Sequence, residues 1–83
     1  MAMHHHLVRI EPGSNAYRFY HLALWPDLVG DVSLVREWGR IGQPGKLRLD
    51  RHDSEQAAGR ALERLVEAKR RRGYRQINAG SSA

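Results

Sequence analysis

The sequence contains no cysteine, so it forms neither a disulfide bond nor a thiolate metal site. It also lacks any apolar run near the ~20 residues that a helix needs to span a bilayer. The opening residues Met1-Ala2-Met3-His4-His5-His6 place no apolar segment behind a basic one, so they do not resemble a signal peptide. We therefore expect a cytoplasmic protein, with association with the nucleoid as a further option, and no membrane partner.

Residue patterns typical of catalysis or metal binding are missing as well. Structural metal sites space their ligands across a fold, whereas His4-His5-His6 is one short run that we interpret as an amino-terminal segment or the remnant of a tag. The serines lie in turn, cap or tail positions and form no nucleophile elbow. The sequence therefore predicts no bound metal, no cofactor and no enzymatic activity.

Basic side chains exceed acidic ones, with 14 Lys and Arg against 9 Asp and Glu and a net charge of +5. Most of the excess lies in the last third of the chain, in Lys69, Arg70, Arg71, Arg72 and Arg75. Such density favours polyanions, with nucleic acid ahead of acidic proteins. The structural alternative is a basic helix end that complements the helix dipole.

Alternating apolar residues and turn signals predict four strands in the first two thirds of the chain. Pro12-Gly13-Ser14-Asn15 and Gly42-Gln43-Pro44-Gly45 are tight turns, and a loop closed by Gly30 follows Pro26. The connections are short, so the strands should be antiparallel. The predicted strands run from His5 to Glu11, Ala16 to Trp25, Val32 to Ile41 and Lys46 to His52.

A single helix should follow, capped at its start by Asp53 or Ser54 and ended at Gly73. Its apolar stripe consists of Ala58, Ala61, Leu62, Leu65 and Val66. The predicted fold class is therefore α+β, a small antiparallel four-stranded sheet followed by one amphipathic helix packed on one face. We expect one domain over residues 7–78, an amino-terminal segment over 1–6 and a flexible tail over 79–83, and the sheet face opposite the helix should be partly exposed.

The run Trp38-Gly39-Arg40 is the most informative motif. In a strand, Arg36, Trp38 and Arg40 share one face, so an indole lies between two guanidinium groups. It offers a flat surface for a base or sugar and cations for phosphates. Gly39 should allow a backbone or ligand to approach closely. The structural alternatives are that Trp38 is a core residue or that Arg36 stacks on it.

Around this motif the sequence resembles the WGR domain family. The residues that carry the resemblance are Phe19-Tyr20, the Asp27-Leu28-Val29-Gly30 loop, Arg36 through Gly42, Gly45, Ala57, Ala58, and Lys69 through Gly73-Tyr74. The similarity runs from about Leu7 to Tyr74, and the chain is most similar to small stand-alone bacterial members. The family is best known from DNA-damage-activated poly(ADP-ribose) polymerases, where it helps recognise DNA ends by packing the motif Trp against a terminal sugar.

The resemblance therefore implies nucleic-acid binding rather than ADP-ribosylation, because 83 residues cannot contain the polymerase domain. We expect Trp38 to be the contact platform and DNA ends or nicks to be the partner. Phosphate contacts should come from nearby and carboxy-terminal cations. The predicted site residues are Trp38, Gly39, Arg40, Arg36, Lys46, Arg48, Lys69, Arg70, Arg71 and Arg72.

Two other functions stay open from the sequence. The chain could be a protein-interaction adaptor that docks a partner, such as a DNA-repair enzyme, on the uncovered sheet face and Trp38, since Trp and Arg also anchor protein interfaces. RNA binding would need Tyr17, Phe19 and Tyr20 aligned on a sheet face to stack unpaired bases.

Overall fold

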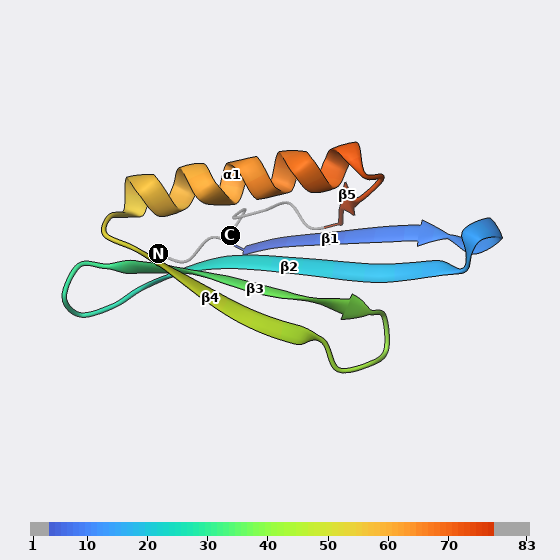
Figure 1. Cartoon of the computed structure of the whole chain (residues 1–83), viewed down its shortest axis with the longest axis horizontal. Coiled ribbons are helices and arrows are strands. Elements are labelled where there is room, and N and C mark those ends of the chain that lie inside the picture. The colour runs from blue at the N-terminus through green and yellow to red at the C-terminus, as the bar shows by residue number, and fades with distance from the viewer. Residues whose placement is uncertain (1–3, 78–83) are drawn as a thin grey trace.

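The computed structural model describes residues 4–77 of the chain. One helix lies across one face of a twisted antiparallel sheet (Figure 1). The elements in chain order are β1 (His4–Glu11), the short 3-10 helix η1 (Pro12–Ser14), β2 (Ala16–Pro26), β3 (Val32–Arg40), β4 (Lys46–His52), α1 (Glu55–Arg71) and β5 (Arg75–Gln76).

The sheet has five strands in the order β4-β3-β2-β1-β5, so the prediction of four strands was one short. The additional strand β5 pairs antiparallel with β1, and Leu7 and Val8 lie opposite Gln76 and Arg75. Two residues are too few to show an alternating pattern. Only the return of the chain to β1 after α1 creates this strand.

Strand β1 begins at His4, so the histidine run lies within the sheet. His4, His5 and His6 are opposite Ala23, Leu22 and His21 of β2. The first strand therefore includes three residues that precede the predicted domain boundary at Leu7. The partner strand β2 is long, so its backbone pairs with the three histidines that precede Leu7 as well as with Leu7 and the residues after it. The predicted tail over 79–83 lies outside the described residues.

The core lies between α1 and the sheet, as the predicted apolar stripe indicated. Ala58 and Leu62 are 0% and 1% exposed, and they pack against Leu7, Leu22 and Leu34, which are equally buried. Ala61 and Leu65 contact the same cluster while partly exposed. The amphipathic helix thus covers one face of the sheet and leaves the other uncovered.

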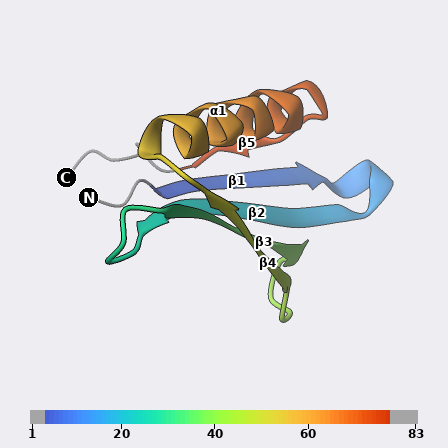
Figure 2. The ribbon, with the colours of Figure 1, turned by 60° about the vertical axis from the view of Figure 1, so that its left-hand side comes forward.

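Both ends of α1 are fixed by local chemistry. The Ser54 side chain accepts a hydrogen bond from the Ala57 backbone N–H at 3.1 Å, which identifies Ser54 as the N-cap in preference to Asp53. At the other end Gly73 has a φ of 95°, a conformation that suits glycine after a helix. Strands β1 and β2 and the turn η1 extend beyond this end of the helix (Figures 1 and 2).

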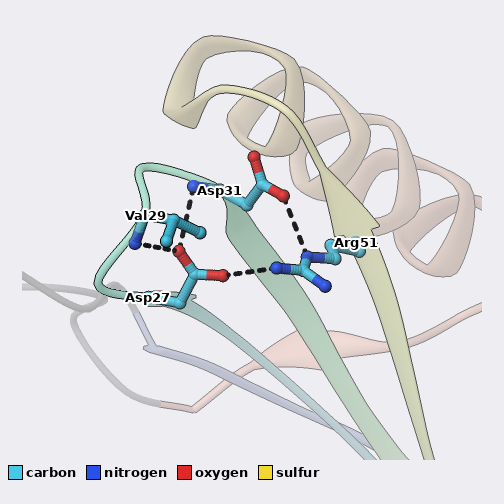
Figure 3. Close-up of polar contacts among 4 residues, drawn as sticks. All are labelled: Asp27, Val29, Asp31 and Arg51. Atoms are coloured by element: carbon cyan, nitrogen blue, oxygen red, sulfur yellow. Dashed lines mark hydrogen bonds and ion pairs between the residues drawn. The ribbon is translucent and has the colours of Figure 1, made fainter.

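The loop between β2 and β3 is organised by one aspartate (Figure 3). Asp27 Oδ1 accepts hydrogen bonds from the backbone N–H groups of Val29 and Asp31 at 2.9 and 3.0 Å. Arg51 from β4 reaches this loop and pairs with the carboxylates of Asp27 and Asp31, each at 2.9 Å. The loop is therefore tied both to its own backbone and to a neighbouring strand.

No helix within residues 4–77 is long and apolar enough to cross a membrane.

Candidate functional site

Trp38 lies on the same face of the sheet as α1. Its strand places Leu34 and Trp38 on one side, and Leu34 is buried beneath the helix. Placing Trp38 on the uncovered face, as the adaptor hypothesis did, was therefore wrong. The indole is half-buried and stacks on Tyr20 with ring centroids 5.8 Å apart and an interplanar angle of 20°. The structure thus combines the two interpretations of Trp38, because one part packs on the core and another part remains accessible.

The neighbours of Trp38 across the strands are aromatic on one side and basic on the other. Tyr20 of β2 and Lys46 of β4 lie directly opposite it in the ladder. The Arg36 guanidinium carbon is 5.8 Å from the indole centroid, and its Nε is 2.9 Å from Asp50 Oδ2. Arg36 is therefore held between a ring and a carboxylate, which favours a supporting role beside Trp38.

An open cleft of about 330 Å³ begins at Trp38 and lies beside the last turn of α1. Its apolar surface comes from aromatic rings, and its charge comes from cations on β1, β2 and α1. The residues that line it are Arg9, Arg18, Tyr20, Trp38, Lys69, Arg72 and Tyr74. The cleft contains no carboxylate among its lining residues, so its lining side chains are suited to an anion with a flat or apolar part.

A row of three arginines crosses the sheet next to Trp38. Arg9 of β1 lies opposite Arg18 of β2, and Arg18 lies opposite Arg40 of β3. Like charges directly opposite one another are unfavourable in a sheet. Arg9 pairs with Glu11 at 2.7 Å, whereas Arg18 forms no ion pair with any carboxylate of residues 4–77. A row of this kind is stabilised when an anion binds to it.

Lys69 projects from the last turn of α1 over two tyrosine rings. Its Nζ is 4.4 Å from the Tyr20 centroid and 5.6 Å from the Tyr74 centroid. Burial lowers the pKa of Lys69 below its usual range, and the positive charges of Arg72 and Arg36 lower it further. The amine therefore lies inside the cleft with aromatic faces, and no carboxylate within residues 4–77 pairs with it.

The basic run at the end of α1 divides between the cleft and other surfaces. Lys69 in the last turn of α1 and Arg72, the residue directly after the helix, both line the cleft. Arg70 donates a hydrogen bond to the Gln76 side chain at 3.2 Å. Arg71 pairs with Glu67 one turn earlier at 3.5 Å. Only half of the predicted basic run therefore faces Trp38.

Two other predicted cations are engaged outside the cleft. Arg40 donates hydrogen bonds to the backbone and side-chain oxygens of Asn15, both at 3.3 Å, and its guanidinium lies 5.3 Å from the Tyr17 centroid. Arg48 pairs with Asp50 at 2.9 Å. Arg40 thus braces the turn between β1 and β2, and Arg48 belongs to the salt bridge that also holds Arg36.

Gly39 allows close approach of a backbone, as predicted, and that backbone belongs to the chain itself. A Cβ added at Gly39 would lie 3.0 Å from the Cα of Gly45 and 3.5 Å from the Phe19 ring. Gly39 points to the face opposite Trp38. The two glycines therefore let strands β3 and β4 meet tightly over Phe19.

The three aromatics proposed for stacking RNA bases do not share a face. Tyr20 is buried beneath the helix at 4% exposure, and Tyr17 and Phe19 lie on the uncovered side. The uncovered side also carries exposed apolar residues, with Trp25 56%, Leu47 63% and Leu49 60% exposed. A continuous three-ring platform of the kind expected for single-stranded RNA is not formed by these residues.

Four residues that line the cleft were not predicted as site residues from the sequence, namely Arg9, Arg18, Tyr20 and Tyr74. A signal for the first two was present, because the hairpin through η1 places Arg9 and Arg18 opposite each other. That register puts two guanidinium groups side by side on the face that also carries Tyr20. Tyr74 gave no such signal, because its position depends on how the chain returns from α1.

No group of three His, Asp or Glu side chains within residues 4–77 is arranged to hold a metal ion. His6 and His21 do lie close, with ring centroids 4.3 Å apart, and His21 Nδ1 is 4.0 Å from Glu37 Oε1. Burial lowers the pKa of His21, and His6 lowers it further, while Glu37 acts in the opposite direction. This cluster lies on the uncovered face, away from the cleft.

Comparison with known proteins identifies a matching family and a similar bacterial protein. A family model described as WGR domain matches residues 3–81. A protein of Sinorhizobium fredii (strain NBRC 101917 / NGR234), described as uncharacterized protein y4dW, is 40% identical over 67 residues, which are 81% of this chain and 33% of that protein. The chain thus spans about a third of the length of this relative. No solved structure matches it.

Proposed function

The chain belongs to the WGR domain family, and from that premise we propose that it is a non-enzymatic module that binds DNA at ends or breaks. In poly(ADP-ribose) polymerases this domain is a nucleic-acid-binding module. The bound DNA would occupy the cleft beside Trp38. The DNA-repair setting known for the polymerases would then apply to this chain as well.

The observation that carries the proposal is the combination of the arginines that line the cleft with the aromatic surface next to them. Arg18 and Arg72 pair with no carboxylate of the described residues and line the same cleft as Trp38. Guanidinium groups suit phosphate oxygens because they donate two parallel hydrogen bonds. The indole beside them offers a flat surface for the sugar or base that the same phosphate carries.

A preference for ends follows from the shape of this surface. An indole that is half-buried against Tyr20 offers only part of its surface to a ligand. Inside a duplex, sugars and bases are covered by their neighbours, whereas a terminal nucleotide leaves one side of its sugar and base open. A strand end or nick can therefore contact Trp38 while its phosphates reach Arg18, Arg72 and Lys69.

The deciding experiment compares one DNA sequence in closed circular, nicked and linear form by fluorescence anisotropy competition. We expect the nicked and linear forms to compete better than the closed circle. Equal competition by all three forms contradicts end recognition and leaves general DNA binding. Single-stranded RNA in the same assay tests the RNA alternative, and stronger competition by RNA than by nicked DNA would favour it.

The variant for this experiment is Trp38→Phe, because Trp38→Ala also removes packing against Tyr20. We expect Trp38→Phe to weaken binding to ends by roughly tenfold, in line with the contribution of one stacked base. Trp25→Phe is the matched control, since Trp25 is exposed on the opposite side of the sheet. Unchanged binding by folded Trp38→Phe would show that Trp38 is not a contact platform.

A second function, as a protein-interaction adaptor, is favoured by the uncovered sheet face. Leu47 and Leu49 of β4 are 63% and 60% exposed there, and such neighbouring apolar side chains are typical of interfaces. A partner on this face would leave the cleft free. Leu49→Lys should then abolish capture of a DNA-repair partner after nuclease treatment without changing DNA binding. Loss of both activities together contradicts two separate surfaces.

A further inference from the structure

Lys69 is one of only two lysines in the sequence, the other being Lys46, whereas arginine provides the remaining twelve of the 14 cations. Lys69 is partly buried in the cleft, with its Nζ over the faces of Tyr20 and Tyr74. Lys46 is exposed on the edge strand β4. The chain therefore carries two amines of the same type in contrasting environments.

The surroundings of Lys69 combine an amine with groups that bind a phosphoryl group. Arg9, Arg18 and Arg72 line the same cleft, and the latter two have no carboxylate partner within residues 4–77. An arginine holds a phosphoryl group by paired, charge-assisted hydrogen bonds. Any phosphorylated small molecule held there is placed beside the Lys69 amine.

The surroundings of Lys69 favour the uncharged form of its amine, which is the nucleophilic form, more than those of an ordinary lysine do. Burial lowers its pKa, and the charges of Arg72 and Arg36 lower it further. The tyrosine faces act in the opposite direction because they attract the ammonium form. The remaining charged or titratable groups that line the cleft are Arg9, Arg18, Tyr20 and Tyr74, none of which is a carboxylate. A larger fraction of Lys69 is thus uncharged at neutral pH than of an ordinary lysine.

We propose that Lys69 is a site of acylation by small acyl phosphates, whose phosphoryl group is held by the arginines of the cleft. The electron pair of the uncharged Nζ attacks the acyl carbon, and the bond between that carbon and the phosphoryl oxygen breaks. Inorganic phosphate leaves with the electron pair of the broken carbon–oxygen bond, and the nitrogen, now bonded to the acyl carbon, releases one proton to solvent. The products are Nζ-acyl-lysine and phosphate.

The reaction would regulate the cleft, and this consequence rests on the proposed function. Acylation replaces a cation by a neutral amide and ends its attraction to both the tyrosine faces and phosphates. DNA and acyl phosphate also compete for the same arginines. Acylation should therefore weaken DNA binding, and bound DNA should protect Lys69 from acylation.

The test treats the whole chain with acetyl phosphate and follows both lysines by peptide mass spectrometry. Lys69 should react roughly tenfold faster than Lys46, because charge-assisted hydrogen bonds hold the acetyl phosphate beside Lys69 only. N-hydroxysuccinimidyl acetate, which has no phosphoryl group, should show a much smaller preference. Inorganic phosphate should slow Lys69 without slowing Lys46.

Two variants separate recognition of the phosphoryl group from simple reactivity. Arg18→Gln should slow the reaction of Lys69 with acetyl phosphate several-fold and leave Lys46 unchanged. Arg60→Gln is the matched control, because it removes the same charge from an exposed part of α1 outside the cleft. The proposal would be overturned by equal reaction rates at Lys69 and Lys46. It would also be overturned if acetyl phosphate and N-hydroxysuccinimidyl acetate showed the same preference for Lys69.

The outcome for acylation is independent of the outcome for DNA. Reaction rates are measured without nucleic acid, and DNA binding is then measured on acylated and untreated chains. Selective acylation of a chain that binds no DNA would overturn the proposed function and leave the acylation site. DNA binding by a chain whose lysines react equally would overturn the acylation site alone.

Discussion

At Gly45, a single residue determines how closely the two strands of the hairpin with the Trp-Gly-Arg motif can approach. A Cβ at this position would lie 2.6 Å from the Trp38 carbonyl oxygen and 2.8 Å from the Phe19 ring. Real Cβ atoms do not approach other atoms this closely, so the strands must separate. The turn after β3 therefore depends on the absence of a side chain more than on flexibility.

The corresponding prediction concerns stability. Gly45→Ala should lower the free energy of unfolding by about 1–3 kcal/mol, the usual effect of overpacking. The measurement is denaturant unfolding followed by circular dichroism. Gly13→Ala is the control, because nothing lies within 4 Å of a Cβ there and its φ is not positive. Equal stability of both variants would mean that the hairpin relaxes freely.

His21 gives a prediction for pH dependence. Its pKa is lowered from the ordinary value of 6.5 by burial and by His6, against the attraction of Glu37. The unfolded chain therefore binds a proton at a higher pH than the folded chain does. As the pH falls from about 6.5 through the lowered pKa of the folded state, this group reduces stability.

The melting temperature of the chain should therefore decrease as the pH is lowered from about 7 to about 5. His21→Gln should show a shallower decrease over the same range, and His52→Gln should retain the slope of the unmodified chain. The measurement is thermal unfolding at a series of pH values with constant ionic strength. A slope that His21→Gln leaves unchanged would assign the pH dependence to other groups.

At the scale of elements, the loop between β2 and β3 is held by its own groups and by an arginine from β4 (Figure 3). Asp27 accepts two backbone hydrogen bonds within the loop, and Arg51 connects it to β4. The loop exposes Leu28 and Val29 at its tip. Because these apolar side chains are exposed, polar contacts rather than burial hold this part of the loop.

Asp27→Ala should lower the free energy of unfolding by about 1 kcal/mol, since two backbone N–H groups lose their acceptor but can reach water. For a domain of this size, that corresponds to a decrease in Tm of roughly 4–8 °C. Asp27→Asn retains an acceptor oxygen and loses only the exposed ion pair, so its Tm should change much less. The prediction fails if both variants melt alike in a calorimeter.

At the scale of the whole molecule, the fold gathers cations that the sequence keeps far apart. Arg9, Arg18 and Lys69 come from β1, β2 and α1, and together they line one cleft. Binding of a polyanion there should depend strongly on salt, because each neutralised phosphate releases counterions. The net charge of +5 adds long-range attraction without selecting the site.

Replacing Arg18 by Gln should therefore reduce the slope of log Kd against log salt concentration by about one. Arg60→Gln carries the same loss of charge and should leave the slope unchanged. The measurement is a titration of end-containing duplex DNA at several salt concentrations. Equal slopes for the two variants would show that DNA is attracted by net charge alone and does not contact the cleft.

Much of the fold could be predicted from local patterns. The strand β4 matches its prediction at both ends, β2 and β3 differ by one residue, and the stripe on α1 covers the core as expected. Alternation and helical spacing are local properties, so they can be read from neighbouring residues. The strand β5 could not be predicted because it exists only by pairing with β1.

The sequence alone was enough to recognise the family, the basic character and three of the residues that line the cleft, namely Trp38, Lys69 and Arg72. The tertiary structure decided which residues face one another. It packed Trp38 against the core on the face covered by α1, hydrogen-bonded Arg40 to Asn15, and brought Arg18 to the cleft. The physical reason is that register and strand twist fix cross-strand neighbours, and these depend on the whole sheet rather than on any one segment.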